Sequence, residues 1–359
     1  MKKILLFFFV IALLTGCAAT EEKIEYETVF YPPLPQKPRI QFLTYISSEE
    51  DIGKKQSAFE EFLVGELPPL KRIKRPYDIV TIKNKIYVMD RAYKKLIVID
   101  LQNKSFDYLQ SRSAAFADPA GIWVTDDDYK YVTDYKRKLV LVFDDKNELV
   151  KTYGKKGELD KPLDVAVYDD SVYVCDFNLH KILVFDKESG DIVRTIGEQG
   201  KEEGKFFKPS HIALDEQGNL FVNDAFNFRM QQFDSSGNFV QTIGYHGDTL
   251  GGFARPKGLA VDNEEHLYVV DTAFENVQIF DVNTGKILLF FGEYGSKPGD
   301  MYMPSPIHIN NKNLDYFQKF ADKDFRLKYL IYVGNSYGPK KINVYGFGDW
   351  TGKSFSDTE

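Results

Sequence analysis

The feature that most constrains this chain is an internal repeat of 43 to 50 residues. Each unit opens with a proline and an apolar segment, and continues with two apolar segments that end in Asp and a last one that ends near Gly. The opening prolines are Pro76, Pro119, Pro162, Pro209, Pro256 and Pro306. Four short strands in 40–50 residues are the size of one propeller blade. The repeat therefore predicts an all-β, six-bladed β-propeller with blades that open near these prolines.

The last repeat lacks a fourth strand, because the chain ends soon after its third apolar segment, 341–345. The N-terminal segment 39–46 has the pattern of the missing strand. If it completes the last blade, the ring closes and no open sheet edge remains. The sequence thus predicts a propeller over residues 38–347, with a C-terminal tail at 348–359.

The first 37 residues resemble the leader of an exported bacterial lipoprotein. Lys2 and Lys3 precede an apolar run, 4–14, that is too short for a membrane-spanning helix, which needs about 20 residues. Leu14-Thr15-Gly16-Cys17 is similar to a lipobox. This resemblance implies a signal peptide at 1–16, a lipidated Cys17, and a tether at 17–37. It also implies a lipid anchor in the bacterial cell envelope, in the outer membrane if the cell is Gram-negative.

The repeats themselves resemble NHL repeats, on the Leu-Tyr-Val-x-Asp strand at 267–271, the stretch 224–229 and the Gly-rich links between units. The resemblance covers roughly residues 75 to 345. The segment 31–40 is also similar to the lead-in of a group of NHL-repeat lipoproteins, which generally lack an assigned activity. Blade one departs from the pattern, with a weak fourth strand at 104–109. The second departure is Asn276, where the repeat usually has a basic residue.

The balance of acidic and basic residues indicates which classes of partner the chain can bind. Lys and Arg total 46, Asp and Glu total 53, and the formal net charge is −7. Nucleic-acid binding favours a basic protein, so no nucleic-acid partner is expected. Cys175 lies in an apolar strand, and with Cys17 lipidated it has no partner for a disulfide.

One repeat position carries residues with metal-binding chemistry. Two residues after each opening proline stand Asp78, Gly121, Asp164, His211, Gly258 and His308. A ring of repeats would place these residues around one axis, at the mouth of the channel. Asp and His can hold a divalent cation such as zinc, and carboxylates can hold calcium. Asp78, Asp164, His211 and His308 are therefore candidate ligands for Zn or Ca. The alternative is that they cap strand starts and bind water in a polar channel.

Aromatic residues recur in the loops between the second and third strands, which belong to the same face. They are Tyr93, Tyr135, Phe177, Phe226, Phe228, Phe274 and Tyr337. Aromatic side chains often anchor binding surfaces. We therefore expect a binding or assembly propeller for an envelope protein, a peptide or a glycan, rather than an enzyme. The alternative function is a metal-dependent hydrolase or lyase that uses the channel-mouth residues.

Two further segments have apolar residues at helical spacing. The first, 57–64, is expected to be a short helix packed on the propeller, or else a helix on the membrane surface. The second is an insertion in the last repeat, 310–328. It is expected either to cover one face of the propeller or to dock a partner.

Overall fold

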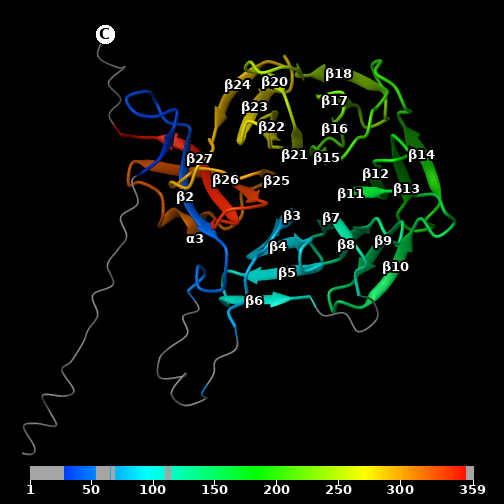
Figure 1. Cartoon of the computed structure of the whole chain (residues 1–359), viewed down its shortest axis with the longest axis horizontal. Helices are drawn as coiled ribbons and strands as arrows, with labels where there is room; N and C mark the ends of the chain where they lie inside the picture. Colours follow the sequence, from blue (N-terminus) through cyan, green and yellow to red (C-terminus); the bar gives the residue numbers. More distant parts are fainter. Residues whose placement is uncertain (1–27, 54–64, 66–68, 110–114, 353–359) are drawn as a thin grey trace, which may run out of the picture.

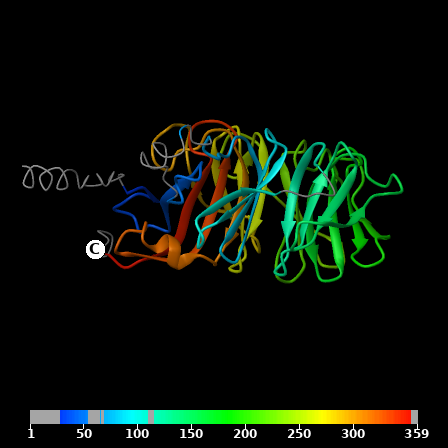
Figure 2. The ribbon, with the colours of Figure 1, turned by 90° about the horizontal axis from the view of Figure 1, so that it is seen from below.

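The chain folds as a ring of β-sheets (Figure 1). The computed structural model describes residues 28–53, 65, 69–109 and 115–352. Within these residues, six sheets of four or five antiparallel strands surround a central axis, which confirms the predicted six-bladed β-propeller. Figure 2 shows the ring from its side, with the strands running between the two faces of the disc. The signal peptide, Cys17 and the expected helix at 57–64 lie outside the described residues.

In each of the first five blades, the strands follow one another from the channel to the rim. Blade one contains β3 (Pro76–Ile82), β4 (Lys85–Asp90), β5 (Lys95–Asp100) and β6 (Ser105–Tyr108). Blade two contains β7 (Pro119–Val124), β8 (Lys130–Asp134), β9 (Leu139–Phe143) and β10 (Leu149–Tyr153). Blade three contains β11 (Pro162–Tyr168), β12 (Ser171–Asp176), β13 (Lys181–Asp186) and β14 (Ile192–Ile196).

Blade four contains β15 (Ile212–Leu214), β16 (Leu220–Asp224), β17 (Arg229–Phe233) and β18 (Phe239–Ile243). Blade five contains β21 (Pro256–Val261), β22 (His266–Asp271), β23 (Asn276–Asp281) and β24 (Ile287–Phe291). A small parallel pair, β19 (Tyr245–His246) and β20 (Gly252–Phe253), lies in the link between these two blades. The innermost strand of blade four begins three residues after its opening proline.

Blade six is closed by the N-terminal segment, as predicted. It contains β25 (Pro304–Asn310), β26 (Phe325–Asn335) and β27 (Ile342–Trp350), followed by β2 (Ile40–Ile46) and β1 (Phe30–Tyr31) at the rim. Strand β2 pairs antiparallel with β27, from Ile40 opposite Phe347 to Ile46 opposite Ile342. Because β27 continues to Trp350, the blade extends past residue 347, where the sequence suggested its end. The innermost strand also starts earlier than expected, at Pro304.

The hydrophobic core lies between neighbouring blades. Each blade buries both of its faces, so the middle strands are continuous apolar runs; in β12, the five residues after Ser171 are all buried. One cluster of buried side chains joins blade six to blade one, and others join successive pairs around the ring. This packing fixes each innermost strand against its neighbours, so the residues that line the channel hold defined positions.

The insertion in blade six contributes to this core. It contains a short helix, α3 (Leu314–Gln318). The side chain of Phe317, in this helix, is fully buried and packs among apolar side chains of blades six and one. Phe325 is also buried, whereas Phe320 is 36 % exposed. The contacts therefore favour the covering role for this segment. Among the described residues, no helix is long and apolar enough to cross a membrane.

The two faces of the disc are built from different loops. The mouth face is formed by the starts of the first strands and by the loops between the second and third strands, such as 90–95 and 176–181. The turn face is formed by the loops between first and second strands and between third and fourth strands, such as 125–129 and 186–191. Helix α3 lies on the turn face, at the lower edge of Figure 2.

Candidate functional site

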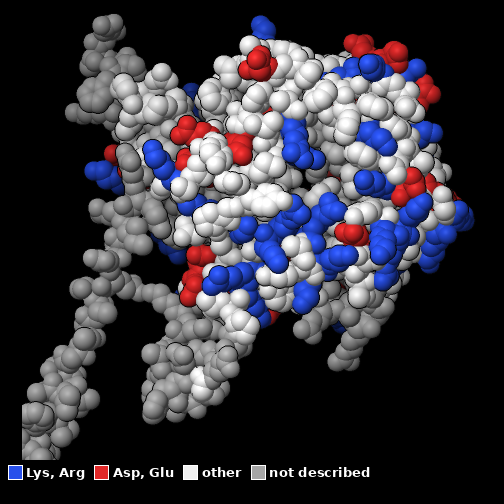
Figure 3. Space-filling view, in the orientation of Figure 1, with Lys and Arg blue, Asp and Glu red and all other residues white. Residues whose placement is uncertain are grey.

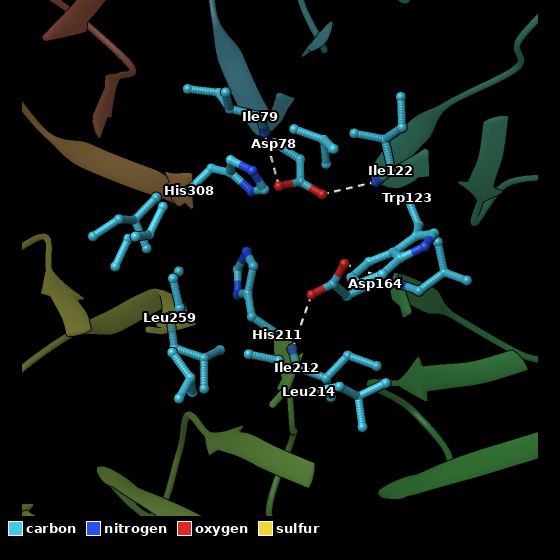
Figure 4. A pocket seen from close by; sticks show the side chains of 18 residues that line it. Asp78, Ile79, Ile122, Trp123, Asp164, His211, Ile212, Leu214, Leu259 and His308 are labelled. Atoms are coloured by element: carbon cyan, nitrogen blue, oxygen red, sulfur yellow. Dashed lines mark hydrogen bonds between the residues drawn. The ribbon is translucent and has the colours of Figure 1, made fainter. Parts of the chain in front are cut away.

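The axis of the propeller holds a cavity of about 210 Å³ that is lined by the innermost strands of all six blades. Five of the six residues at the predicted repeat position line it: Asp78, Asp164, His211, Gly258 and His308. At the sixth position, Gly121 packs against blade three, where a Cβ would lie 2.5 Å from Oδ1 of Asp164. Figure 4 shows the two histidines and two aspartates directed into the cavity.

Both aspartates tie neighbouring innermost strands together. Asp78 accepts hydrogen bonds from the N–H groups of Ile79 (2.8 Å) and Ile122 (2.7 Å), the latter in blade two. Asp164 accepts hydrogen bonds from the N–H groups of Val165 (2.8 Å) and Ile212 (2.9 Å), the latter in blade four. Each carboxyl oxygen therefore already accepts a backbone N–H. This supports the strand-capping alternative for the two carboxyl groups.

Burial shifts the pKa values of the carboxyl and imidazole groups in the cavity in the direction that favours their uncharged forms. It raises the pKa of Asp78 to about 7, against the hydrogen bonds from Ile122 and Ile79. Burial, together with the charge of Asp78, raises the pKa of Asp164 well above its usual value. Burial lowers the pKa of His211 to about 3 and that of His308 to about 4. Both imidazoles are therefore neutral at pH 7.

The histidines keep unused hydrogen-bonding capacity. Nδ1 of His211 lies 2.9 Å from Oγ of Ser210, but Nε2 is buried without a hydrogen-bond partner. Nε2 of His308 is likewise buried and without a partner. Across the channel, the ring of Tyr77 stacks on His211 with centroids 5.7 Å apart. Because these two residues belong to blades one and four, the stack bridges opposite sides of the ring.

The residues fit a metal ion poorly. Within the described ranges, no group of three or more His, Cys, Asp or Glu side chains is arranged to hold one. The four candidate ligands share one cavity, but the carboxyl oxygens accept backbone N–H groups instead of converging on a point. The positive charge of Lys257, which helps lower the pKa of His211, also opposes a bound cation.

The predicted aromatic residues differ in exposure. Phe226 is 55 % exposed, Tyr337 46 % and Tyr93 39 %. Phe228 is partly buried against the core between blades four and five and stacks on His246, so it supports the fold. Tyr135, Phe177 and Phe274 are half-buried. The exposed members leave apolar rings on the mouth face that are available to a partner.

The gathering of basic residues at the channel mouth was not predicted from the sequence. Figure 3 shows Lys and Arg side chains gathered over the middle of one face and over the blades below and to the right. The sequence carries a signal for them, because a basic residue directly precedes the opening proline in four repeats: Arg75, Lys161, Lys208 and Arg255. Arg91 and Lys257 extend the set. These residues make the mouth face basic in a chain of net negative charge.

The repeated aspartates at the ends of the second strands hold the mouth loops. In blade three, Asp176 accepts hydrogen bonds from the N–H groups of Asp160 and Lys161 in the link before the blade. It also accepts from Asn178 and Leu179 in the loop that follows. Asp90 makes the corresponding bonds in blade one. The carboxylate thereby fixes the loops on which the basic and aromatic side chains stand.

Comparison with known proteins agrees with the fold. A family model described as a six-bladed β-propeller matches residues 155–244. The chain is similar to virginiamycin B lyase from Staphylococcus aureus, with 16 % identity and a TM-score of 0.51 over 78 % of this chain and 86 % of that one. It is also similar to a protein of unknown function from Bacteroides thetaiotaomicron, with 14 % identity and a TM-score of 0.58. The match covers 89 % of this chain and 76 % of that one.

A catalytically inactive variant of the same lyase, in a crystal structure with quinupristin, has 15 % identity. Its TM-score is 0.52, over 76 % of this chain and 95 % of that one. At these levels of identity the similarity shows the fold alone. The class that fold and comparisons define is thus a six-bladed β-propeller, and its function has to be argued from the site.

Proposed function

We propose that this chain is a lipid-anchored lipoprotein of the bacterial cell envelope whose mouth face binds a protein, peptide or glycan partner. The observation that carries the binding role is the set of exposed aromatic rings, Tyr93, Phe226 and Tyr337. They stand on loops held by buried polar side chains, which are Asp90, Asp224 and Asn335 respectively. Rigid loops lose little conformational entropy when they bind, and aromatic side chains are common anchors of interfaces.

Neighbouring cations hold some of these rings in place. The guanidinium of Arg75 lies 4.9 Å from the ring centroid of Tyr337, and its Nη2 donates to the Tyr337 hydroxyl. Nζ of Lys74 lies 5.7 Å from the ring of Tyr93. Phe226 packs edge-on against Phe177 and Phe207. The rings are therefore held in position while part of each surface remains open to a partner.

The test of binding is capture of a partner from envelope extract with the intact lipoprotein. The double variant Phe226→Ala, Tyr337→Ala should lose the captured partner. The matched control is Val193→Ala, Leu288→Ala, which truncates side chains that are 62 % and 53 % exposed on outer strands. The control should retain the partner. Equal capture by both variants would overturn the binding role of the mouth face.

Anchoring is tested separately through Cys17. If a thioether-linked lipid on this residue holds the protein to a membrane, the Cys17→Ser variant should move from the membrane fraction to the soluble fraction. The variant should fold as before, because Cys17 precedes the described propeller. Retention of Cys17→Ser in the membrane fraction would contradict the anchor.

The alternative of a metal-dependent hydrolase or lyase would use Asp78, Asp164, His211 and His308. The arrangement of these groups does not favour it, since no described cluster could hold a metal ion.

A further inference from the structure

Lys257 adds a positive charge to the mouth face, at the start of β21. It follows the opening proline of blade five and is partly buried. The charges that act on its ammonium group most strongly belong to Arg255 in the same blade, Arg91 in blade one and Lys161 in blade three. Its charge is also felt by His211 in blade four. Lys257 stands at the start of β21, the innermost strand of its blade, so it lies beside the channel rather than on the rim.

This cation lacks a compensating anion. No acidic side chain of the described residues forms an ion pair with Lys257, Arg255 or Lys161 within 4.0 Å. Nη2 of Arg91 lies 3.7 Å from Oδ1 of Asp118 and donates a hydrogen bond to the hydroxyl oxygen of Tyr135 (3.1 Å). Burial and the three like charges lower the pKa of Lys257. Holding these cations together costs free energy that a bound anion would offset.

Aromatic rings hold the surrounding cations without neutralising them. The guanidinium of Arg91 lies 4.9 Å from the ring centroid of Tyr77 and 5.3 Å from that of Tyr135. Nζ of Lys161 lies 4.5 Å from the ring of Phe177 and 5.8 Å from that of Tyr135. Such contacts attract a cation to the face of the ring. Both cations are thus oriented before any ligand arrives, and the charge of Lys161 has no acidic partner within 4.0 Å among the described residues.

The groups beneath the mouth repel an anion little. The pKa values of Asp78 and Asp164 are raised by burial, and both carboxyl groups already accept two backbone N–H groups. The imidazole of His211, with its free Nε2, lies close enough to feel the charge of Lys257. Cations above and weakly charged groups below favour an anionic ligand over a metal ion.

We propose that the mouth of the channel is a binding site for an oxyanion, a carboxylate or a phosphate, with Lys257 as its central contact and Arg91, Lys161 and Arg255 around it. The anion can be a free ion or an acidic side chain of a peptide. This inference rests on the proposed binding role of the mouth face and gives that role its chemistry, because it makes the preferred partner acidic.

The test is isothermal titration of the full-length chain in detergent at constant ionic strength. One arm uses inorganic phosphate and the other a peptide of ten glutamates, with a peptide of ten lysines as the negative probe. Binding of phosphate alone would identify a site for a free anion. Binding of the glutamate peptide would identify a site for acidic partners. Absence of binding in both arms would overturn the proposal.

Two variants assign the site to its residues. Lys257→Met keeps an unbranched side chain without the charge, and should weaken binding of the glutamate peptide at least about tenfold. The control Lys146→Met removes the same charge from the turn face and should leave the affinity unchanged. Lys161→Met, at the edge of the site, should weaken binding about threefold. Unchanged binding by Lys257→Met and Lys161→Met would overturn the proposal.

Thermal unfolding separates a binding cation from a structural one. Without ligand, Lys257→Met should melt at the same temperature as the wild type or higher, because the variant relieves repulsion among like charges. The stabilisation by the glutamate peptide should be lost in this variant. A large drop in the melting temperature of the ligand-free variant would instead assign Lys257 a structural role.

The outcome also separates this site from the proposed function. If neither phosphate nor the glutamate peptide binds, while Phe226→Ala, Tyr337→Ala loses the captured envelope partner, the oxyanion site is wrong and the binding role stands. If the glutamate peptide requires Lys257 but the aromatic double variant leaves capture unchanged, the oxyanion site stands and the proposed use of the aromatic surface is wrong.

Discussion

The mouth face and the turn face of this propeller are built from the same repeat but differ in charge and in how their loops are held. On the mouth face, carboxylates are buried beneath the loops, and basic side chains extend outwards. On the turn face, acidic residues stand in the exposed turns themselves, as at 126–128, 169–170 and 215–216. The comparison shows that the net charge of a chain says little about the face that carries a site.

The largest difference is expected from carboxylates of blade three. Asp176 is fully buried and serves four backbone N–H groups of the mouth face. Asp176→Ala leaves these donors without a partner and should lower the free energy of unfolding by about 3 kcal/mol or more. Asp186→Ala, in a turn-face loop, should cost much less, because Asp186 serves N–H groups of Glu188 and Ser189 that water can reach. Chemical denaturation of both variants checks the contrast.

A second contrast concerns pH. On the turn face, the hydrogen bond to Asp262 raises the pKa of His266, so the stabilisation by His266 is present below pH 6.5 and is lost as pH rises through its raised pKa. The cost of His266→Gln, about 1 kcal/mol at pH 5, should shrink by pH 8. If it is equal at both pH values, the charged pair does not form.

In the channel the sign is reversed. The pKa of His211 falls to about 3, below its unfolded value of 6.5, so its contribution to stability is lost as pH falls from 6.5 towards 3. The cost of His211→Gln should therefore decrease by about 2 kcal/mol between pH 7 and pH 5. Denaturation of the variant and the wild type across this range measures the trend. An increase in the cost would show that His211 is charged in the folded protein.

The smallest effect is expected from the acidic turns. Asp126→Asn, Asp127→Asn should change the affinity for the glutamate peptide less than twofold. These carboxylates stand in the turn-face loop between β7 and β8, whereas Lys257 stands at the mouth-face start of β21. Salt screens charges beyond about 8 Å at physiological ionic strength. A larger change in the titration would mean that the field of the whole disc, and not the local site, sets the affinity.

The sequence predicted the ring, its closure and the residues of the channel, because each of these depends on position within a repeat. Asp78 and His308 are far apart in the chain but line one cavity for this reason. The stack of Tyr77 on His211 could not be predicted, since repeat position does not say how far a side chain extends across the axis. The basic residues before the prolines stand in the sequence, but a net charge of −7 summed over the chain does not indicate that they gather on one face.

Closure by β2 sets when this protein can finish folding. Ile46 pairs with Ile342, so the contact cannot form before β27 has been synthesised. Joining ends separated by about 300 residues costs roughly 5 kcal/mol of chain entropy and slows folding. Until β27 pairs with it, β2 has an open edge facing the place of that strand, so the incomplete ring is exposed to aggregation.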